Sequence, residues 1–393
     1  MDFVLTEEQE MIRKLAKDFC TQFVVPALRG KEWVQDPNVR FPWSIVEKGF
    51  ELGLKALMVP KEYGGAEVDT LTACVVDEEL ACVDQGVAEI FDQLWNESRK
   101  LAVLGTKEQK DWFFKRFMNE PRFLATTTGS EPRHGTDHWI RYDGTTFDTM
   151  AVLKGDKWVI KGTKIFISMG AEASVYMCHA CTDPSKPMSQ GTSIFIVPRE
   201  TPGLKVGTIY DKISERFMNN AEIIYEDCGV PKENLLGELN KGMQVFDPRL
   251  AATNVEAGAI ALGTARGAFE AALAYAKQRV QGGKPIIEHQ AIGMKLAEMA
   301  TLIEAARTLI WRAAWAVDYK RPYDPKMHAM SKWYAADVAF RVASSALEIF
   351  GGNGIMSMDG PAQKYLRDSL AMLHADGTRE AHLLRIQERL QKE

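Results

Sequence analysis

Residues 366–382 read LRDSLAMLHADGTREAH, and this segment places Asp376-Gly377-Thr378 nine positions after Arg367. A second segment, Glu348-Ile-Phe-Gly-Gly-Asn-Gly354, lies upstream between two helical patterns. The backbone N–H groups of a glycine cluster can approach a phosphate or a ring edge, because no side chain stands in the way. A helix C-cap turn explains the same glycines without any ligand. The choice between these interpretations depends on the rest of the chain.

Length and charge limit the classes of protein. The chain has 393 residues, 46% hydrophobic and 26% charged, which is enough for two or three packed domains and a buried cofactor. Lys and Arg number 48 against 53 Asp and Glu, so the net charge is -5. Because this balance supplies no broad cationic field, we expect neither nucleic acid nor a membrane as principal partner.

The termini and cysteines indicate a cytoplasmic protein. The N-terminal residues are amphipathic and acidic, and no signal, transit or transmembrane segment is visible. Six cysteines are scattered through a long chain, which favours reduced thiols. Cys178-His-Ala-Cys181 has the spacing of a redox or zinc motif, but it lies in a strand pattern and a second ligand pair is missing. We therefore predict two structural cysteines and no metal site.

Hydrophobic periodicity divides the chain into three domains: 1–120, 121–237 and 238–393. The first is helical and opens with a capping-box pattern from Thr6 to Gln9. The second consists of short β-rich runs separated by Gly, Pro and Asp. The third carries long Ala-rich helical patterns at 249–280, 288–320, 326–350 and 361–391. The prediction is an α+β fold with an N-terminal helical domain, a middle β domain and a C-terminal four-helix bundle that supports subunit association.

Several segments in this order resemble the acyl-CoA dehydrogenase family, and the resemblance covers essentially the whole chain. They include Pro60-Lys-Glu-Tyr-Gly-Gly65, Ser130-Glu131-Pro132, Lys164-Ile-Phe-Ile-Ser168, Glu233-Asn-Leu-Leu-Gly237, the glycine cluster and the Asp376 segment. The resemblance implies an FAD-dependent enzyme that oxidises an acyl-CoA thioester. Electrons would then pass to an electron-transfer flavoprotein.

The resemblance also implies which residues contact the flavin. Thr127, Gly129 and Ser130 correspond to the family's flavin-binding segment, while Phe166 and Ser168 replace a tryptophan and a threonine beside the ring system. Phe166 can still stack on a flat ring, and Ser168 can still donate a hydrogen bond. Further contacts are implied at the following positions: Arg279, Gln290, Glu348, Gly351, Gly352, Thr378 and Glu380.

Arg279 and Gln290 correspond to residues that reach the FAD of a neighbouring subunit, so the resemblance implies a homo-oligomer, commonly a tetramer. The arginine suits the pyrophosphate charge. Glu380 stands where the family usually has a glutamine, which puts that contact in doubt.

Asp376 stands where the family usually has a glutamate as catalytic base. The implied reaction removes a proton beside the thioester carbonyl while hydride passes to the flavin. Aspartate is one methylene shorter, which withdraws the carboxylate by ~1.5 Å. Ala375 replaces a common tyrosine and opens space beside the base, so we expect a bulky or alicyclic acyl-CoA as substrate, of the cyclohexane- or cyclohexene-carboxyl type.

Asp92 is a second candidate base, because it lies in the segment that lines the inner end of the acyl pocket in this family. Among apolar neighbours its pKa would rise, which suits a base. The alternative is a solvated or salt-bridged helix residue on the same face as Glu89. Two bases would permit 1,4-elimination from a cyclohexene-type thioester as well as 1,2-elimination.

For the substrate, the resemblance implies a pantetheine contact at Thr136 and further contacts at Ala375 and Gly377 beside the base. The family's arginine near the far end of coenzyme A is displaced here, since Asn254 occupies its position and Arg249 is the nearest basic substitute in the sequence. The insertion at 133–149 is expected to reshape this entrance. His374, beside the base, is expected either to cap or pack locally or to tune Asp376 electrostatically.

Two other functions compete with the dehydrogenase. An oxidase or monooxygenase could use the same fold with oxygen. A flavin-containing DNA-binding relative would need a basic C-terminal surface, whereas this C-terminus mixes both signs of charge.

Overall fold

The computed structural model describes residues 3–136, 144–244, 247–320, 322–356 and 360–393. The helices that precede the sheet are α1 (Glu7–Phe19), α2 (Val25–Leu28), α3 (Pro37–Arg40), α4 (Trp43–Glu51), α5 (Thr70–Ala81), α6 (Gln85–Leu104) and α7 (Lys107–Phe117). The predicted capping box is confirmed, because the Thr6 hydroxyl accepts from the Gln9 N–H and the Gln9 side chain accepts from the Thr6 N–H.

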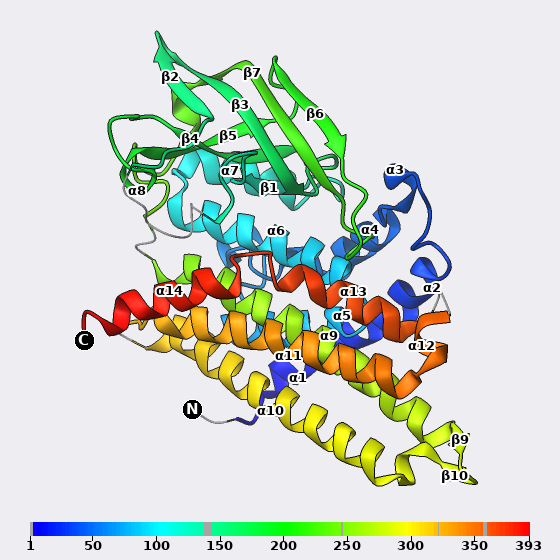
Figure 1. Cartoon of the computed structure of the whole chain (residues 1–393). Helices are drawn as coiled ribbons and strands as arrows, with labels where there is room; N and C mark the ends of the chain where they lie inside the picture. The colour runs from blue at the N-terminus through cyan, green and yellow to red at the C-terminus, as the bar shows by residue number, and fades with distance from the viewer. Residues whose placement is uncertain (1–2, 137–143, 245–246, 321, 357–359) are drawn as a thin grey trace.

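A β sheet follows these helices and forms the upper layer in Figure 1. Its strands are β1 (Ala125–Thr128), β2 (Met150–Lys154), β3 (Lys157–Ser168), β4 (Val175–Cys181), β5 (Thr192–Pro198), β6 (Leu204–Ile209), β7 (Asn220–Pro231) and β8 (Leu235–Leu236), with the short helix α8 (Met188–Gly191) between β4 and β5. The order is β6-β7-β3-β2-β4-β5-β8, and β1 pairs with β4. The β3–β7 register shifts between Lys164 and Ile167, which frees Phe166 from regular pairing.

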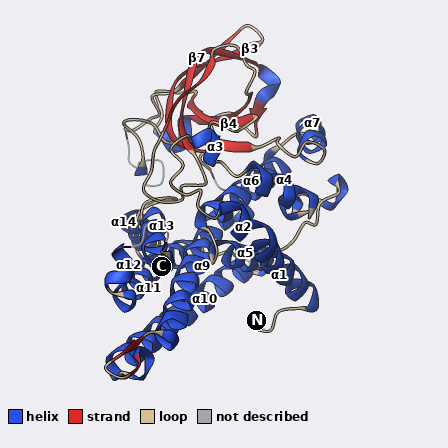
Figure 2. Cartoon of the chain, turned by 90° about the vertical axis from the view of Figure 1, so that its right-hand side faces the viewer, coloured by secondary structure: helices blue, strands red, loops and turns tan. Residues whose placement is uncertain are grey.

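The chain then returns to helices, which form the lower layers in Figures 1 and 2. They are α9 (Ala252–Gln278), α10 (Gln290–Tyr319), α11 (Lys326–Phe350), α12 (Gly352–Met356), α13 (Pro361–Met372) and α14 (Arg379–Leu390). A small hairpin of β9 (Val280–Gln281) and β10 (Lys284–Pro285) joins α9 to α10. The predicted order of helical, β and helical parts is confirmed, and so is the α+β class.

Alanine-rich faces let the C-terminal helices pack closely. A single hydrophobic core runs through α5, α9, α10 and α11, with buried members such as Ala261, Ala306 and Ala339. None of the helices among the described residues is both long and apolar enough to span a membrane.

The prediction of one helical stretch over 361–391 is wrong. The chain leaves α13 at Met372, and α14 starts only after Thr378, whose hydroxyl accepts from the Ala381 N–H. Asp376 and Gly377 between them have φ angles of 51° and 95°. Left-handed backbone cannot continue a right-handed helix, so the Asp376 segment forms a turn between two helices.

The cysteines are buried and free, as the structural interpretation predicted. Cys178 packs in one hydrophobic cluster of the sheet and Cys181 in another, because their side chains leave opposite faces of β4.

Candidate functional site

The Asp376 turn is held by buried groups from two other helices. Lys332 of α11 donates from Nζ to the carbonyl oxygens of Met372 (2.7 Å), Gly377 (2.8 Å) and Ala375. His382 of α14 donates from Nε2 to the Asp376 carbonyl oxygen at 3.0 Å. A Cβ on Gly377 would lie 3.1 Å from this histidine nitrogen, and the φ of 95° also favours glycine. The turn is therefore tightly specified.

Charged groups from distant segments surround the Asp376 carboxyl. Burial raises its pKa, Lys332 opposes that shift, and Glu215 adds to it. Glu215 is buried with a φ of 48°, and its backbone N–H donates to Asp368 Oδ1 at 2.8 Å. Its carboxylate accepts from Gln85 Nε2 at 2.6 Å. A carboxyl with a raised pKa is a stronger base than an exposed aspartate.

Asp92 lies on a buried polar face of α6, so the solvated interpretation of this residue is wrong. Glu89, Asp92, Asn96 and Arg99 follow one another at spacings of three or four residues and therefore share one helix face. Asp92 is 4% exposed and Glu89 8% exposed. Asn96 Nδ2 donates to Asp92 Oδ2 at 2.8 Å, and Arg99 donates to Asn96 Oδ1 at 2.7 Å. We call these four residues the α6 polar face.

The α6 polar face meets further carboxyls on α5 and α9. Arg99 forms a bidentate ion pair with Glu256, with one bond of 2.9 Å. Burial raises the pKa of Asp92 well above its usual value, and Asp77, Glu256, Glu89 and Asp376 add to that shift. Within the described residues, Asp92 Oδ1, Glu89 Oε1 and both Asp77 oxygens have no hydrogen-bond partner. Within the described residues Arg99 is hydrogen-bonded to one of these carboxyls, Glu256, and acts on Asp77 and Asp92 through its charge.

The predicted flavin contacts on the sheet leave room for a flat ring system. Phe166 has a φ of 60° and is 59% exposed at the register shift of β3, with Tyr210 at 4.9 Å between ring centroids. Ser168 ends β3 and is half-buried. A Cβ on Gly129, Gly351 or Gly352 would meet nothing within 4 Å. On the sheet, the exposed Phe166 ring and the open backbone of Gly129 fit a flat flavin ring. Gly351 and Gly352 lie elsewhere, at the junction of α11 and α12, where the adjacent Phe350 stacks on Tyr275 of α9.

Other predicted flavin contacts are already engaged within the chain. The Thr127 hydroxyl donates to Glu97 Oε1 at 2.7 Å and accepts from Lys100, so it faces α6. Glu348 is paired with Lys295. Thr378 uses its hydroxyl oxygen to cap α14, while Glu380 is exposed in the first turn of that helix. Ser130 is half-buried beside Gly129.

Arg279 and Gln290 lie far from the sheet. Both are exposed and flank the β9–β10 hairpin, Arg279 after α9 and Gln290 at the start of α10. Figures 1 and 2 agree that this hairpin is at the opposite end of the molecule from the strands. Within one chain these two residues are not brought together with Phe166 and Ser168.

The two residues predicted near the far end of coenzyme A, Asn254 and Arg249, lie in different surroundings. Asn254 is buried and accepts from Arg385 Nη1 at 3.1 Å, and Arg385 also contacts His328 Nε2 at 2.9 Å. Arg249, the basic substitute expected from the sequence, is paired with Asp247 and mostly exposed. The cation that lies at Asn254 therefore comes from α14.

The remaining predicted substrate contacts belong to the Asp376 turn and to the polar insertion. Ala375 is half-buried and Gly377 buried in the turn, and Thr136 is half-buried. Residues 137–143 of the insertion lie outside the described residues.

Sequence proximity misled one assignment. His374 is exposed, so a packed role is wrong for it; the histidine that contacts the turn is His382. Burial, together with the charges of Lys332 and Arg385, lowers the pKa of His382 to about 3, so its ring is neutral. Lys332, Glu215 and Arg385 were also missed, since no local motif marks them.

One cluster has metal-ligating residue types. Glu131, His134 and Asp148 bring ligand atoms within 4.8 Å of one another. Glu131 already accepts from the backbone N–H groups of Asp148 (2.6 Å) and Thr149 (2.9 Å) and pairs with buried Lys164 at 2.9 Å. These bonds satisfy the carboxylate without an ion.

Three protein-family models match the chain in succession. Models for the N-terminal, middle and C-terminal domains of acyl-CoA dehydrogenase match residues 6–120, 126–228 and 240–391.

Individual relatives agree with these models. Probable acyl-CoA dehydrogenase YngJ of Bacillus subtilis (strain 168) is 37% identical over 398 residues, covering 100% of both chains. Cyclohex-1-ene-1-carbonyl-CoA dehydrogenase of Syntrophus aciditrophicus (strain SB) is 35% identical over 352 residues, covering 90% of this chain and 82% of the relative. The solved structure of butyryl-CoA dehydrogenase from Megasphaera elsdenii has a TM-score of 0.91 at 33% identity, covering 100% of both chains.

Proposed function

The chain belongs to the acyl-CoA dehydrogenase family, and from this premise we propose that it dehydrogenates a bulky, alicyclic acyl-CoA with Asp376 as the base. The enzyme is an FAD-dependent oxidoreductase. The observation that carries the base assignment is the Asp376 turn, whose backbone carbonyls are held by Lys332 and His382 and whose carboxyl has a raised pKa.

Different residues act as the base, donate to the thioester carbonyl oxygen and bind the flavin. Bound FAD supplies the hydride acceptor. Asp376 takes the proton beside the thioester carbonyl, and its own backbone N–H is the donor assigned to the carbonyl oxygen. Gly129, Ser130, Phe166 and Ser168 hold the flavin ring, while Gly351 and Gly352, at the junction of α11 and α12, are assigned to the nucleotide half of the FAD. Thr127 contributes backbone only, since its hydroxyl is bound to Glu97.

The substrate class rests on the space and charge around the base. Ala375 leaves the entrance beside Asp376 without an aromatic ring, and Asp92 places a second buried carboxyl on α6. Asp376 is among the charges that raise the pKa of Asp92, which supports a location facing the same interior region. One relative is named for a cyclohexene thioester. Together these features favour a cyclohexane- or cyclohexene-carboxyl thioester.

Anaerobic flavin bleaching against linear, branched and cyclic acyl-CoAs, with product identification, tests this function. We expect the fastest bleaching with a cyclic thioester and slow reoxidation in air, followed by rapid electron transfer to an electron-transfer flavoprotein. Rapid oxygen consumption by the reduced enzyme would instead indicate an oxidase. Bleaching by short straight-chain thioesters alone would reject the alicyclic substrate.

Asp92→Asn tests the second base. An amide cannot accept the proton, so we expect bleaching by cyclohexene-carboxyl-CoA to slow about 100-fold, while linear thioesters change little. Glu89→Gln is the matched variant, because Glu89 is buried one helical turn earlier on the same face. Unchanged rates on every cyclic thioester in Asp92→Asn would remove Asp92 from catalysis.

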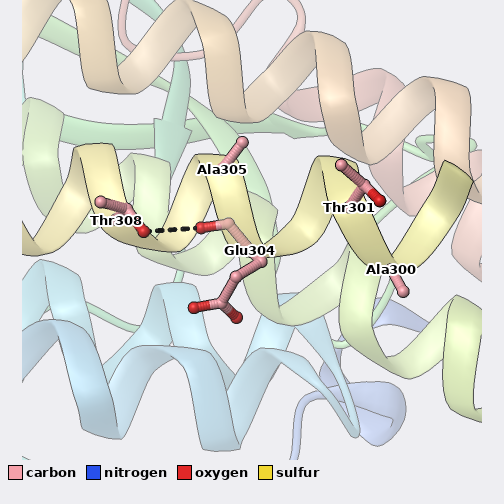
Figure 3. A pocket seen from close by; sticks show the side chains of 5 residues that line it. All are labelled: Ala300, Thr301, Glu304, Ala305 and Thr308. Carbon is pink, nitrogen blue, oxygen red and sulfur yellow. Dashed lines mark hydrogen bonds between the residues drawn. The ribbon is translucent and has the colours of Figure 1, made fainter. Parts of the chain in front are cut away.

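We also propose that the enzyme is a homo-oligomer in which each flavin contacts two chains. The predicted contacts at Arg279 and Gln290 lie at the end of the molecule opposite the sheet, so a second chain must supply them to Phe166 and Ser168. Helix α10 offers a packing face with small side chains. A pocket on this helix is lined by Ala300, Thr301, Glu304, Ala305 and Thr308, whose side chains Figure 3 shows. Small residues let a neighbouring helix approach closely.

Arg279→Ala tests this shared site. A charge-assisted bond to the pyrophosphate would be lost, so we expect FAD to bind about 10- to 100-fold more weakly, measured by flavin fluorescence titration. Lys284→Ala on the same hairpin is the control, because the Lys284 side chain is exposed and its amine donates to the Glu288 carbonyl. Monomeric holoenzyme in light scattering, or unchanged FAD affinity in Arg279→Ala, would contradict the shared site.

A further inference from the structure

A buried lysine donates hydrogen bonds to backbone carbonyls on both sides of the candidate base and does not contact the carboxylate of that base. Lys332 lies on α11 and is 1% exposed. An ammonium has three N–H donors, and here its partners are the carbonyl oxygens of Met372, Ala375 and Gly377. These carbonyls precede and follow Asp376, so one side chain fixes the turn on both sides of it.

The first of these carbonyls belongs to the last residue of α13, where helix carbonyls have no partner within the helix. A cation at this position is favoured by the helix dipole. The other two carbonyls belong to a turn whose left-handed φ angles leave them outside regular structure. Lys332 therefore satisfies groups that the turn itself cannot pair.

The ammonium also acts on the carboxyls around it. Burial lowers the pKa of Lys332 and the carboxyls of Asp376, Glu89 and Glu215 oppose that shift, which leaves the pKa at about 8. These groups face it from the turn, from α6 and from the segment before β7, and His382 faces it from α14. Among the described residues no carboxylate accepts directly from Lys332. Its charge acts on Asp376 through space.

We propose that Lys332 is a positioning residue for the base: its ammonium holds the Asp376 turn in place and keeps the Asp376 carboxylate ionised. This inference rests on the proposed role of Asp376 in proton removal. It adds an effect with a definite sign, because Lys332 and Glu215 act on Asp376 in opposite directions.

The test measures the anaerobic flavin-bleaching rate per bound FAD against pH for the holoenzyme and for Lys332→Met and Glu215→Gln. The rate is constant at higher pH, which we call the plateau, and falls at lower pH as Asp376 becomes protonated. We call this fall the acid limb. In Lys332→Met the opposing charge is lost, so this limb moves to higher pH, and the misplaced turn lowers the plateau about 100-fold. In Glu215→Gln the limb moves to lower pH.

Two further lysine variants separate positioning from folding. Lys326→Met removes a buried lysine of the same helix that pairs with Glu393, so its limb should stay in place. Lys332→Arg keeps the charge but changes the donor geometry, so the plateau falls while the limb stays near that of the parent enzyme.

Three results would contradict the proposal or the base assignment on which it depends. An unchanged acid limb in Lys332→Met, with activity falling only in proportion to FAD content, would reduce Lys332 to a structural role and overturn the proposal. If that variant does not fold, Lys332→Gln retains neutral donors, and an unchanged limb there overturns the proposal equally. Full activity in Asp376→Asn would instead remove the base assignment on which both proposals depend.

Discussion

Replacing Asp376 by asparagine is expected to slow anaerobic flavin bleaching by an acyl-CoA about 10²- to 10⁴-fold, the usual contribution of a general base. The amide keeps the size of the side chain but accepts no proton. FAD content and thermal stability should change little, because the turn is held through the backbone carbonyls of Met372, Ala375 and Gly377. Stopped-flow absorbance of the flavin at several pH values measures the effect.

The same variant should also change how the bleaching rate depends on pH. Burial raises the pKa of Asp376, so its carboxyl takes up a proton at a higher pH than an exposed aspartate does. The bleaching rate of the unmodified enzyme should therefore fall as pH decreases through that raised pKa, and this limb should vanish in Asp376→Asn. Asp156→Asn, in an exposed turn after β2, is the control. A surviving limb in Asp376→Asn would assign it to another group.

Replacing Arg99 by methionine is expected to destabilise the folded enzyme by about 3–5 kcal/mol, because it leaves a buried charge without its partner. Arg99 and Glu256 are 5% and 0% exposed, and the guanidinium also donates to Asn96. Without it, Glu256 stays among the carboxyls of Asp77 and Asp92. The shift in the urea or thermal midpoint measures the loss, at matched protein and FAD concentration.

Two variants check that the effect comes from the buried ion pair. Arg99→Met combined with Glu256→Gln removes both charges, so much of the lost stability should return. Arg13→Met breaks an exposed pair with Glu10 and should cost less than about 1 kcal/mol. Equal losses in Arg99→Met and Arg13→Met would show that the interior around α6 solvates these charges well.

Local patterns predicted much of this protein. The capping box at Thr6, the β-rich middle part and the alanine-rich helices were identified because each depends on neighbours within one element. The predictions that failed depended on backbone turns or on contacts between elements, which such patterns do not show. The helical pattern over 361–391 was read through the Asp376 turn, since the left-handed φ of an aspartate is not visible in a hydrophobic period.

The sequence also could not establish helix phase. Asp92 was left between a solvated surface and a buried pocket, and burial at 4% exposure excluded the first. His374 was considered because it adjoins the base, whereas His382, one turn into α14, makes the contact. Arg249 was the nearest basic residue in the chain to Asn254, but Arg385 is the nearest in space.

By itself the sequence determined the family, the order of the three parts and the position of Asp376, because these are carried by short motifs and by periodicity within single elements. Only the tertiary structure decided which groups surround that carboxyl. Lys332 is 45 positions from Gly377, and Glu215 is 153 positions from the Asp368 that holds its backbone. Such contacts depend on how helices dock and turn about their axes. The charge of the base is set by that docking, not by its neighbours in the chain.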